Sequence, residues 1–147
     1  MSNENSKQSK NKYSKYIKRF EDLDYEFEHL QEGCQKDILE IAYLPLSEHQ
    51  MHSLKTILQD ISLKCGQERN TLETGFKLLK GAEKSLDKDS MGEINAVKPI
   101  KLMLSQGKKH ISELKDLHEY VLNSFKRANI RERNLISKIH ANDEKEI

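Results

Sequence analysis

The sequence has no tryptophan, two prolines and only two cysteines in 147 residues. Cys34 and Cys65 are too few for a disulfide framework, and their separation does not match the CxxC spacing of zinc or redox sites. We therefore expect both to be buried thiols. No stretch of about 18 apolar residues could span a membrane, and residues 1–12 contain no apolar run typical of a secretory signal. The expectation is a cytoplasmic protein that uses no cofactor.

Charge of neither sign dominates, because the formal net charge is +1 at pH 7. The chain as a whole is therefore not drawn to nucleic acid or to a membrane surface. Hydrophobic residues make up 35% of the chain and charged residues 33%. This lean apolar content suits an elongated single domain with a thin core.

Apolar residues recur every three or four positions from Tyr13 to Leu44, which is the spacing of one buried helix face. Asp37 is the only interruption. Pro45 is expected to end this helix, because proline cannot continue the hydrogen-bond ladder and disfavours helical geometry in the residue before it.

Two further helices follow in the same way. Ser47 and Gln50 are spaced for a capping box, so a second helix is predicted to open at Glu48. Its seam keeps register through three glycines, which favours one helix; an end at Cys65-Gly66 with a fresh start nearby is the alternative.

The third periodic run extends from Val97 to Ile139, after a second candidate capping box at Ser90 and Glu93. Pro99 is expected to kink its early part. A break at Gly107 would create an additional helix.

Short connectors between long amphipathic helices require neighbouring helices to lie antiparallel. The predicted fold is all-α: an elongated antiparallel three-helix bundle or coiled coil, with four helices if the chain breaks near Gly66 or Gly107. We expect a disordered basic arm over residues 1–12, one helical domain over residues 13–141 and a disordered acidic tail over residues 142–147.

His52, Leu54 and Lys55 resemble the core of histidine phosphotransfer domains, in which leucine and lysine follow the phosphoryl-accepting histidine on an exposed helix face. The resemblance implies His52 as phosphoacceptor beside Lys55, and a compact four-helix bundle. Thr56 stands where that family usually has a glycine, whose small size lets the response-regulator domain approach the imidazole.

Other signals of chemistry are weak. His49 and His52 lie three apart near Glu48, but no HExxH pattern accompanies them, so we expect surface residues and no metal. His118 lies on a seam and is expected to be a hydrogen-bonded core residue. Phosphate loops and nucleophile elbows are absent from the sequence, and a narrow bundle should leave little volume for a substrate cleft. We therefore expect no catalytic activity.

Antiparallel folding separates the charges. The end that holds residues 1–20 and 69–101 has 13 basic and 6 acidic residues, against 12 and 18 in the remainder. The predicted basic end comprises Lys12, Lys15, Lys18, Arg19, Lys77, Lys80, Lys84, Lys98 and Lys101. It could attract anionic lipid or nucleic acid, although few arginines and aromatics are present and ordinary solvated lysines are the simpler interpretation.

A second basic group, Lys126, Arg127, Arg131 and Arg133, is expected to lie beside the acidic stretch at residues 21–32. The first and third helices run parallel in this topology, so these charges should pair within the chain.

Five apolar residues occupy outward helix positions: Tyr25, Leu39, Leu63, Leu102 and Ile130. Such positions nominate a binding surface for another protein. The predicted function is a non-catalytic protein–protein interaction module, an adaptor, chaperone-like protein or inhibitor, with self-association as a further option. Histidine phosphotransfer through His52 and a basic-ended rod that binds lipid or nucleic acid are the alternatives.

Overall fold

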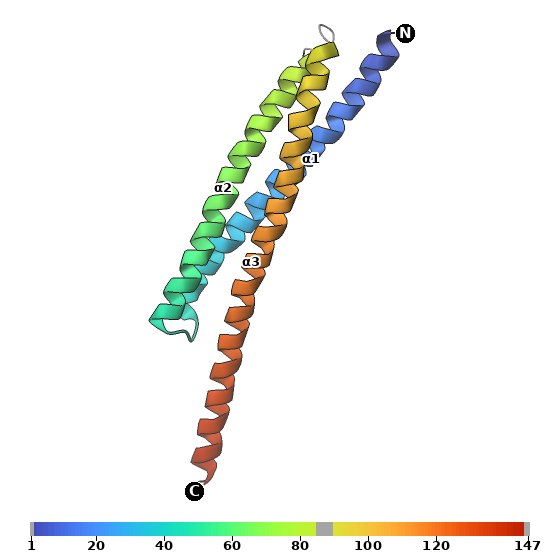
Figure 1. Ribbon diagram of the computed structural model, residues 1–147. Helices are drawn as coiled ribbons and strands as arrows, with labels where there is room; N and C mark the ends of the chain where they lie inside the picture. Colours follow the sequence, from blue (N-terminus) through green and yellow to red (C-terminus); the bar gives the residue numbers. More distant parts are fainter. Residues whose placement is uncertain (1, 85–89, 146–147) are drawn as a thin grey trace.

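Three long helices form the protein. The computed structural model describes residues 2–84 and 90–145, with side chains for residues 13–83 and 97–142. Within these ranges the chain forms α1 (Ser2–Glu40), a short 3-10 helix η1 (Ile41–Tyr43), α2 (Glu48–Lys84) and α3 (Ser90–Lys145), and no strand occurs there. Figure 1 shows a rod in which α1 and α3 run in one direction and α2 in the other. The all-α prediction is confirmed.

The connection between α1 and α2, hereafter the elbow, is a tight turn. The Leu44 amide donates to the Ile41 carbonyl at 3.1 Å, just before Pro45. The Ser47 hydroxyl then accepts from the Gln50 amide, and the Gln50 side chain accepts from the Ser47 amide, both at 3.2 Å. This reciprocal pair of hydrogen bonds is the predicted capping box, and it explains why α2 begins at Glu48.

Glycines do not interrupt the helices, so the four-helix alternative is wrong. α2 continues through Gly66 and Gly75, and α3 continues through Pro99 and Gly107. At Gly75 the reason is close packing, because an added Cβ would lie 2.8 Å from both Met103 Sδ and Phe20 Cε1. A missing side chain at this position lets the three helices approach one another.

The first and third helices extend close to the two ends of the described chain. α1 begins at Ser2, so nearly all of the predicted arm is helical, and α3 continues to Lys145 through most of the predicted tail. Continuous helix is the simple outcome of these sequences, since the predicted arm and tail contain neither proline nor glycine. The side chains of the Ser90 and Glu93 candidate cap lie outside the described residues.

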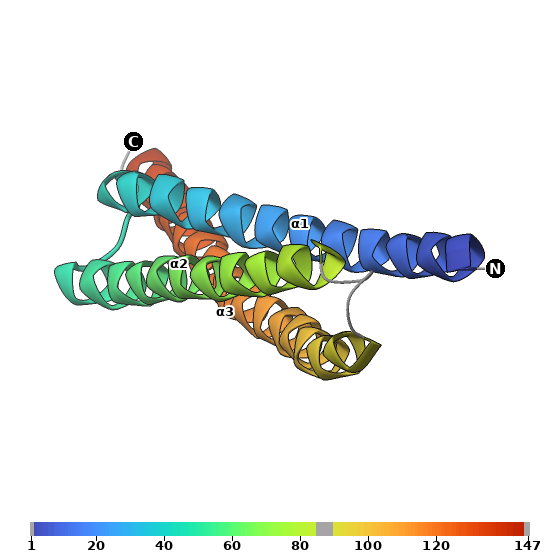
Figure 2. The same cartoon turned by 90° about the horizontal axis from the view of Figure 1, so that it is seen from above.

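The predicted seams form the core. Fully buried side chains come from all three helices and include Phe27, Leu58, Ile61, Ile100 and Val121. Figure 2 shows α1 and α2 side by side, with α3 crossing the pair obliquely. No described helix is long and apolar enough to cross a membrane.

The apolar seam of α3 continues beyond the end of the buried core. Ala128 is its last buried residue, and every side chain from 129 to 142 is exposed. Leu135 and Ile139, which the periodicity placed on the seam, therefore have no helix beside them in this chain. The physical reason is length, because α1 and η1 end at Tyr43 while α3 runs on past that level.

Two glycines of α2 allow a test of this packing. Gly81→Ala should raise the free energy of unfolding by about 0.5–1 kcal/mol, because alanine favours helix and a Cβ there meets nothing within 4 Å. Gly75→Ala should lower it by about 1–3 kcal/mol, because the buried Phe20 ring must move. Urea denaturation measures both changes, and a gain in stability for both variants would contradict the close approach at Gly75.

Candidate functional site

A long groove runs between α1 and α2. Its volume is about 1020 Å³, and all of its lining residues belong to these two helices. On α1 they extend from Phe20 to Ile38, which corresponds to about 27 Å of helix. The sequence led us to expect too little volume for a cleft. The volume of the groove is larger than expected because the groove extends along the length of the two helices.

Gly66 on α2 and Gln31 on α1 both line the groove. An added Cβ at Gly66 would lie 3.4 Å from Nε2 of Gln31. Nε2 of Gln31 in turn donates to the backbone carbonyl of Ser62 at 3.1 Å. The small residue on α2 thus makes room for a polar side chain from α1 that ties the helices together.

An arginine anchors the two walls of the groove to each other. Nε of Arg69 on α2 donates to Oδ1 of Asp24 on α1 at 2.9 Å, and Nη2 lies 3.7 Å from Oε2 of Glu28. The hydrogen bond to Asp24 and the nearby carboxylates raise the pKa of Arg69 above its ordinary value. The guanidinium therefore remains charged and forms ion pairs with the carboxylates of Asp24 and Glu28.

The apolar part of the groove combines buried and accessible side chains. Phe20 and Leu72 are buried, Ile38 and Phe76 are half-buried, and Leu63 is 61% exposed. Polar residues complete the lining, among them Glu21, Gln59, Gln67, Asn70 and Glu73. An apolar strip with a polar margin is the arrangement that binds an amphipathic helix.

The α1–α3 side of the bundle has a smaller groove of about 600 Å³, lined in part by Tyr25. At its base, Nε2 of His118 lies 2.6 Å from Oδ2 of Asp37. The hydrogen bond predicted for His118 is thus confirmed, although the residue is half-buried at the edge of the core. Its partner Asp37 is the polar residue that interrupts the α1 seam. Lys115 donates to Glu26 at 3.1 Å across the same groove.

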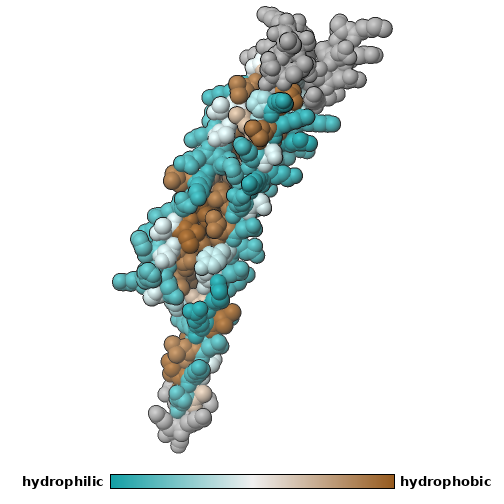
Figure 3. Space-filling model, in the orientation of Figure 1, coloured by the Kyte–Doolittle hydropathy of each residue, from teal (hydrophilic) through white to brown (hydrophobic). Residues whose placement is uncertain are grey.

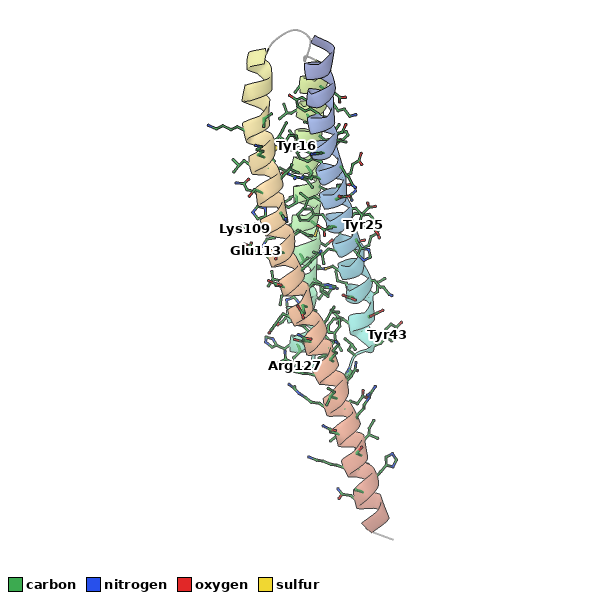
Figure 4. All side chains as sticks on the ribbon, turned by 90° about the vertical axis from the view of Figure 1, so that its right-hand side faces the viewer. Tyr16, Tyr25, Tyr43, Lys109, Glu113 and Arg127 are labelled. Atoms are coloured by element: carbon green, nitrogen blue, oxygen red, sulfur yellow. The ribbon has the colours of Figure 1, made fainter. Side chains whose placement is uncertain are left out.

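All five residues predicted to bind a partner are exposed, by 54% to 74%. They do not form one surface, because Leu63 lines the α1–α2 groove, Tyr25 lines the α1–α3 groove, and Leu39, Leu102 and Ile130 line neither. Figure 4 shows Tyr16 between the helices and Tyr25 and Tyr43 on the outside of α1. Which of these residues bind a partner stays a prediction.

The basic end is partly occupied by contacts within the chain. Arg19 lies 6.0 Å from the centre of the Tyr16 ring, Lys80 lies 5.4 Å from that of Phe76, and Lys77 pairs with Glu73 at 3.5 Å. The other members whose side chains are described, Lys15, Lys18, Lys98 and Lys101, are exposed. Lys12 and Lys84 lie outside the described side chains.

His52 and Lys55 are exposed near the start of α2. The His52 carbonyl accepts a hydrogen bond from the Thr56 hydroxyl at 2.8 Å, an ordinary contact within a helix. The phosphotransfer resemblance implies a compact four-helix bundle, which the three long helices do not form. Among the side chains that the structure describes, no group of three or more His, Cys, Asp or Glu residues could hold a metal ion.

Sequence reasoning missed the α1–α2 groove. Asp24, Gln31 and Ile38 recur at seven-residue intervals and mark one edge of the α1 seam. A polar heptad position beside a seam, combined with Gly66 on the neighbouring helix, was the available signal. The pairing of Asp24 with Arg69 depends on the rotation of the helices about their axes, which periodicity alone does not fix.

Compared with known proteins, the chain matches no family model, no curated protein and no solved structure.

Both thiols are buried and unpaired, as predicted. Burial raises the pKa of Cys34 to about 12, helped by neighbouring Cys65 and Asp37, and burial also raises the pKa of Cys65 to about 11. Both remain protonated at neutral pH, and the thiol is the unreactive form.

We expect a thiol reagent at pH 8 to modify the folded protein at least about 100-fold more slowly than the protein in urea, because reaction requires the helices to open. Absorbance of the released chromophore follows the reaction. Rapid modification of either cysteine in the folded protein would contradict the burial of the thiols.

Proposed function

We propose that this protein is a non-catalytic interaction module, an adaptor, chaperone-like protein or inhibitor, that receives a helix of a larger protein in its α1–α2 groove. The single observation that carries the proposal is the shape of this groove, which is about 27 Å long and walled by two helices. An occupying helix would convert the three-helix bundle locally into a four-helix bundle, in which each helix packs against two neighbours.

The chemistry of the groove supports the same function. Leu63 and Phe76 offer apolar contacts on α2, and Ile38 offers one on α1. Anchors at such positions typically dominate the affinity of a helix for a groove, while the polar margin contributes specificity. The acidic residue Glu21 at the margin favours a helix with basic residues beside its apolar stripe.

We also propose a cytoplasmic location. Cys34 and Cys65 are two free thiols in one core, an arrangement suited to a reducing compartment.

Leu63→Glu tests the proposal, with Leu102→Glu as its matched control. The two leucines are 61% and 58% exposed, but only Leu63 lines the groove. Protein retained from a cell extract by the wild type should be quantified by mass spectrometry. We expect at least one protein to be retained equally by the wild type and the control, and about tenfold less by Leu63→Glu, because a carboxylate in the groove would lose water on binding.

Circular dichroism should show the same helix content for all three proteins, since both positions are exposed. If Leu63→Glu and Leu102→Glu retain the same proteins in the same amounts, the groove is not the binding site.

A further inference from the structure

The last part of α3 extends well beyond the rest of the bundle. His118 contacts Asp37 across two parallel helices, so Glu40 at the end of α1 is level with about residue 121 of α3. From there to Lys145, α3 continues for about 35 Å. Figure 1 shows this end alone, below the elbow. We call residues 129–142, all exposed, the projecting segment.

The projecting segment keeps an apolar stripe without a partner helix. Leu135, Ile136 and Ile139 are 60%, 46% and 51% exposed. At about 100° per residue these side chains cover roughly a quarter of the helix circumference and continue the buried seam that ends at Ala128. Figure 3 shows apolar surface toward this end of the rod. A narrow stripe of this kind matches one neighbouring helix.

Basic residues flank the stripe on both sides. On the helix, Arg131 and Lys138 fall on one flank and Arg133 on the other. The sequence led us to expect Lys126, Arg127, Arg131 and Arg133 to pair with the acidic stretch of α1, and this expectation is wrong. Among the described side chains these four form no ion pair, while Arg69 and Lys115 pair with Asp24, Glu28 and Glu26.

A surface of complementary charge lies at the elbow of the same chain. Glu32, Glu40, Leu39 and Tyr43 form this elbow surface, together with one lysine, Lys36. Its two apolar members have the greatest exposure among the large apolar side chains described, 74% for Leu39 and 90% for Tyr43. Figure 4 shows Tyr43 at the lower end of α1, pointing away from the bundle.

Within one chain the projecting segment cannot reach the elbow surface, because α3 continues beyond the elbow and points away from α1. Two chains can bring these surfaces together. With a two-fold axis near the elbow, two rods meet end to end, and each projecting segment lies antiparallel along the other chain's α1. The segment of residues 129–142 is about 21 Å long, enough to run along the last turns of α1.

We propose that the projecting segment is a docking element for a second copy of this chain, and that it binds the elbow surface of that copy reciprocally. In this antiparallel alignment Arg131 lies beside Glu40 and Lys138 beside Glu32, while Leu135 lies about one helical turn from Leu39. Such an isologous contact uses both surfaces twice and leaves no copy of either uncovered. It goes beyond the proposed function and concerns a different part of the molecule from the α1–α2 groove.

Two other arrangements fit the segment less well. Direct antiparallel pairing of two projecting segments would set Arg131 of one chain near Lys138 of the other, which is repulsive. Insertion into a membrane surface needs a wider apolar face, and Glu132 lies within this stripe.

Charge reversal provides the test. Sedimentation velocity of the full chain should show a dimer of the 17.2 kDa wild type. The tail variant Arg131→Glu with Lys138→Glu, and the elbow variant Glu32→Lys with Glu40→Lys, should each dissociate about tenfold or more readily, because like charges then face each other. An equimolar mixture of the two variants should dimerise again, because both reciprocal contacts become complementary in the mixed dimer.

The control Lys98→Glu with Lys101→Glu makes the same charge change near the other end of α3 and should dimerise as the wild type does. Recovery in the mixture also shows that both variants are folded. A monomeric wild type, with or without binding to anionic vesicles, would overturn the proposal. So would a dimer that resists both variants, or one that the tail variant disrupts and the mixture does not restore. None of these results tests the proposed binding of a partner helix in the α1–α2 groove.

Discussion

The lengthwise packing of three apolar seams holds this bundle together, and the other features of the structure follow from it. A seam tolerates a polar residue only where a facing helix satisfies it. Asp37 meets His118 at 2.6 Å, and Glu68 meets His110 at the same distance. Partly buried pairs of this kind add little net stability but disfavour other alignments, because a shift along the seam would leave a carboxylate or an imidazole without its partner.

The same packing leaves function to the outer surfaces. The core is thin, and the two hollows described above are grooves that run along pairs of helices. The α1–α2 groove and the projecting segment of α3 are separate, and both expose apolar side chains beside charged ones. The proposed dimer uses the outer face of α1 near the elbow, whereas the proposed partner helix binds between α1 and α2.

Much of the fold was predictable because heptad spacing and capping chemistry are local. Ser47 with Gln50 fixed the start of α2, and Pro45 limited α1. The length of each apolar seam could be predicted from the sequence. The extension of α3 beyond α1 and α2 could not, because it depends on how the three helices align along the rod. The site was less accessible: the periodicity identified Leu63 as outward, but the groove beside it depends on helix rotation and on Gly66. The predicted pairing of Arg131 with the acidic stretch of α1 was wrong for a different reason. It assumed that α1 and α3 end at the same level, whereas α3 continues beyond the end of α1.

Hydrogen–deuterium exchange resolved by residue tests the central claim, that continuous seams bind three unbroken helices. Slow exchange should extend through Gly66 and Gly75 in α2 and through Gly107 in α3, with the slowest amides near Leu58, Ile61 and Val121, where the core is most buried. Fast exchange centred on any of the three glycines, dividing a helix into independently opening halves, would contradict the account.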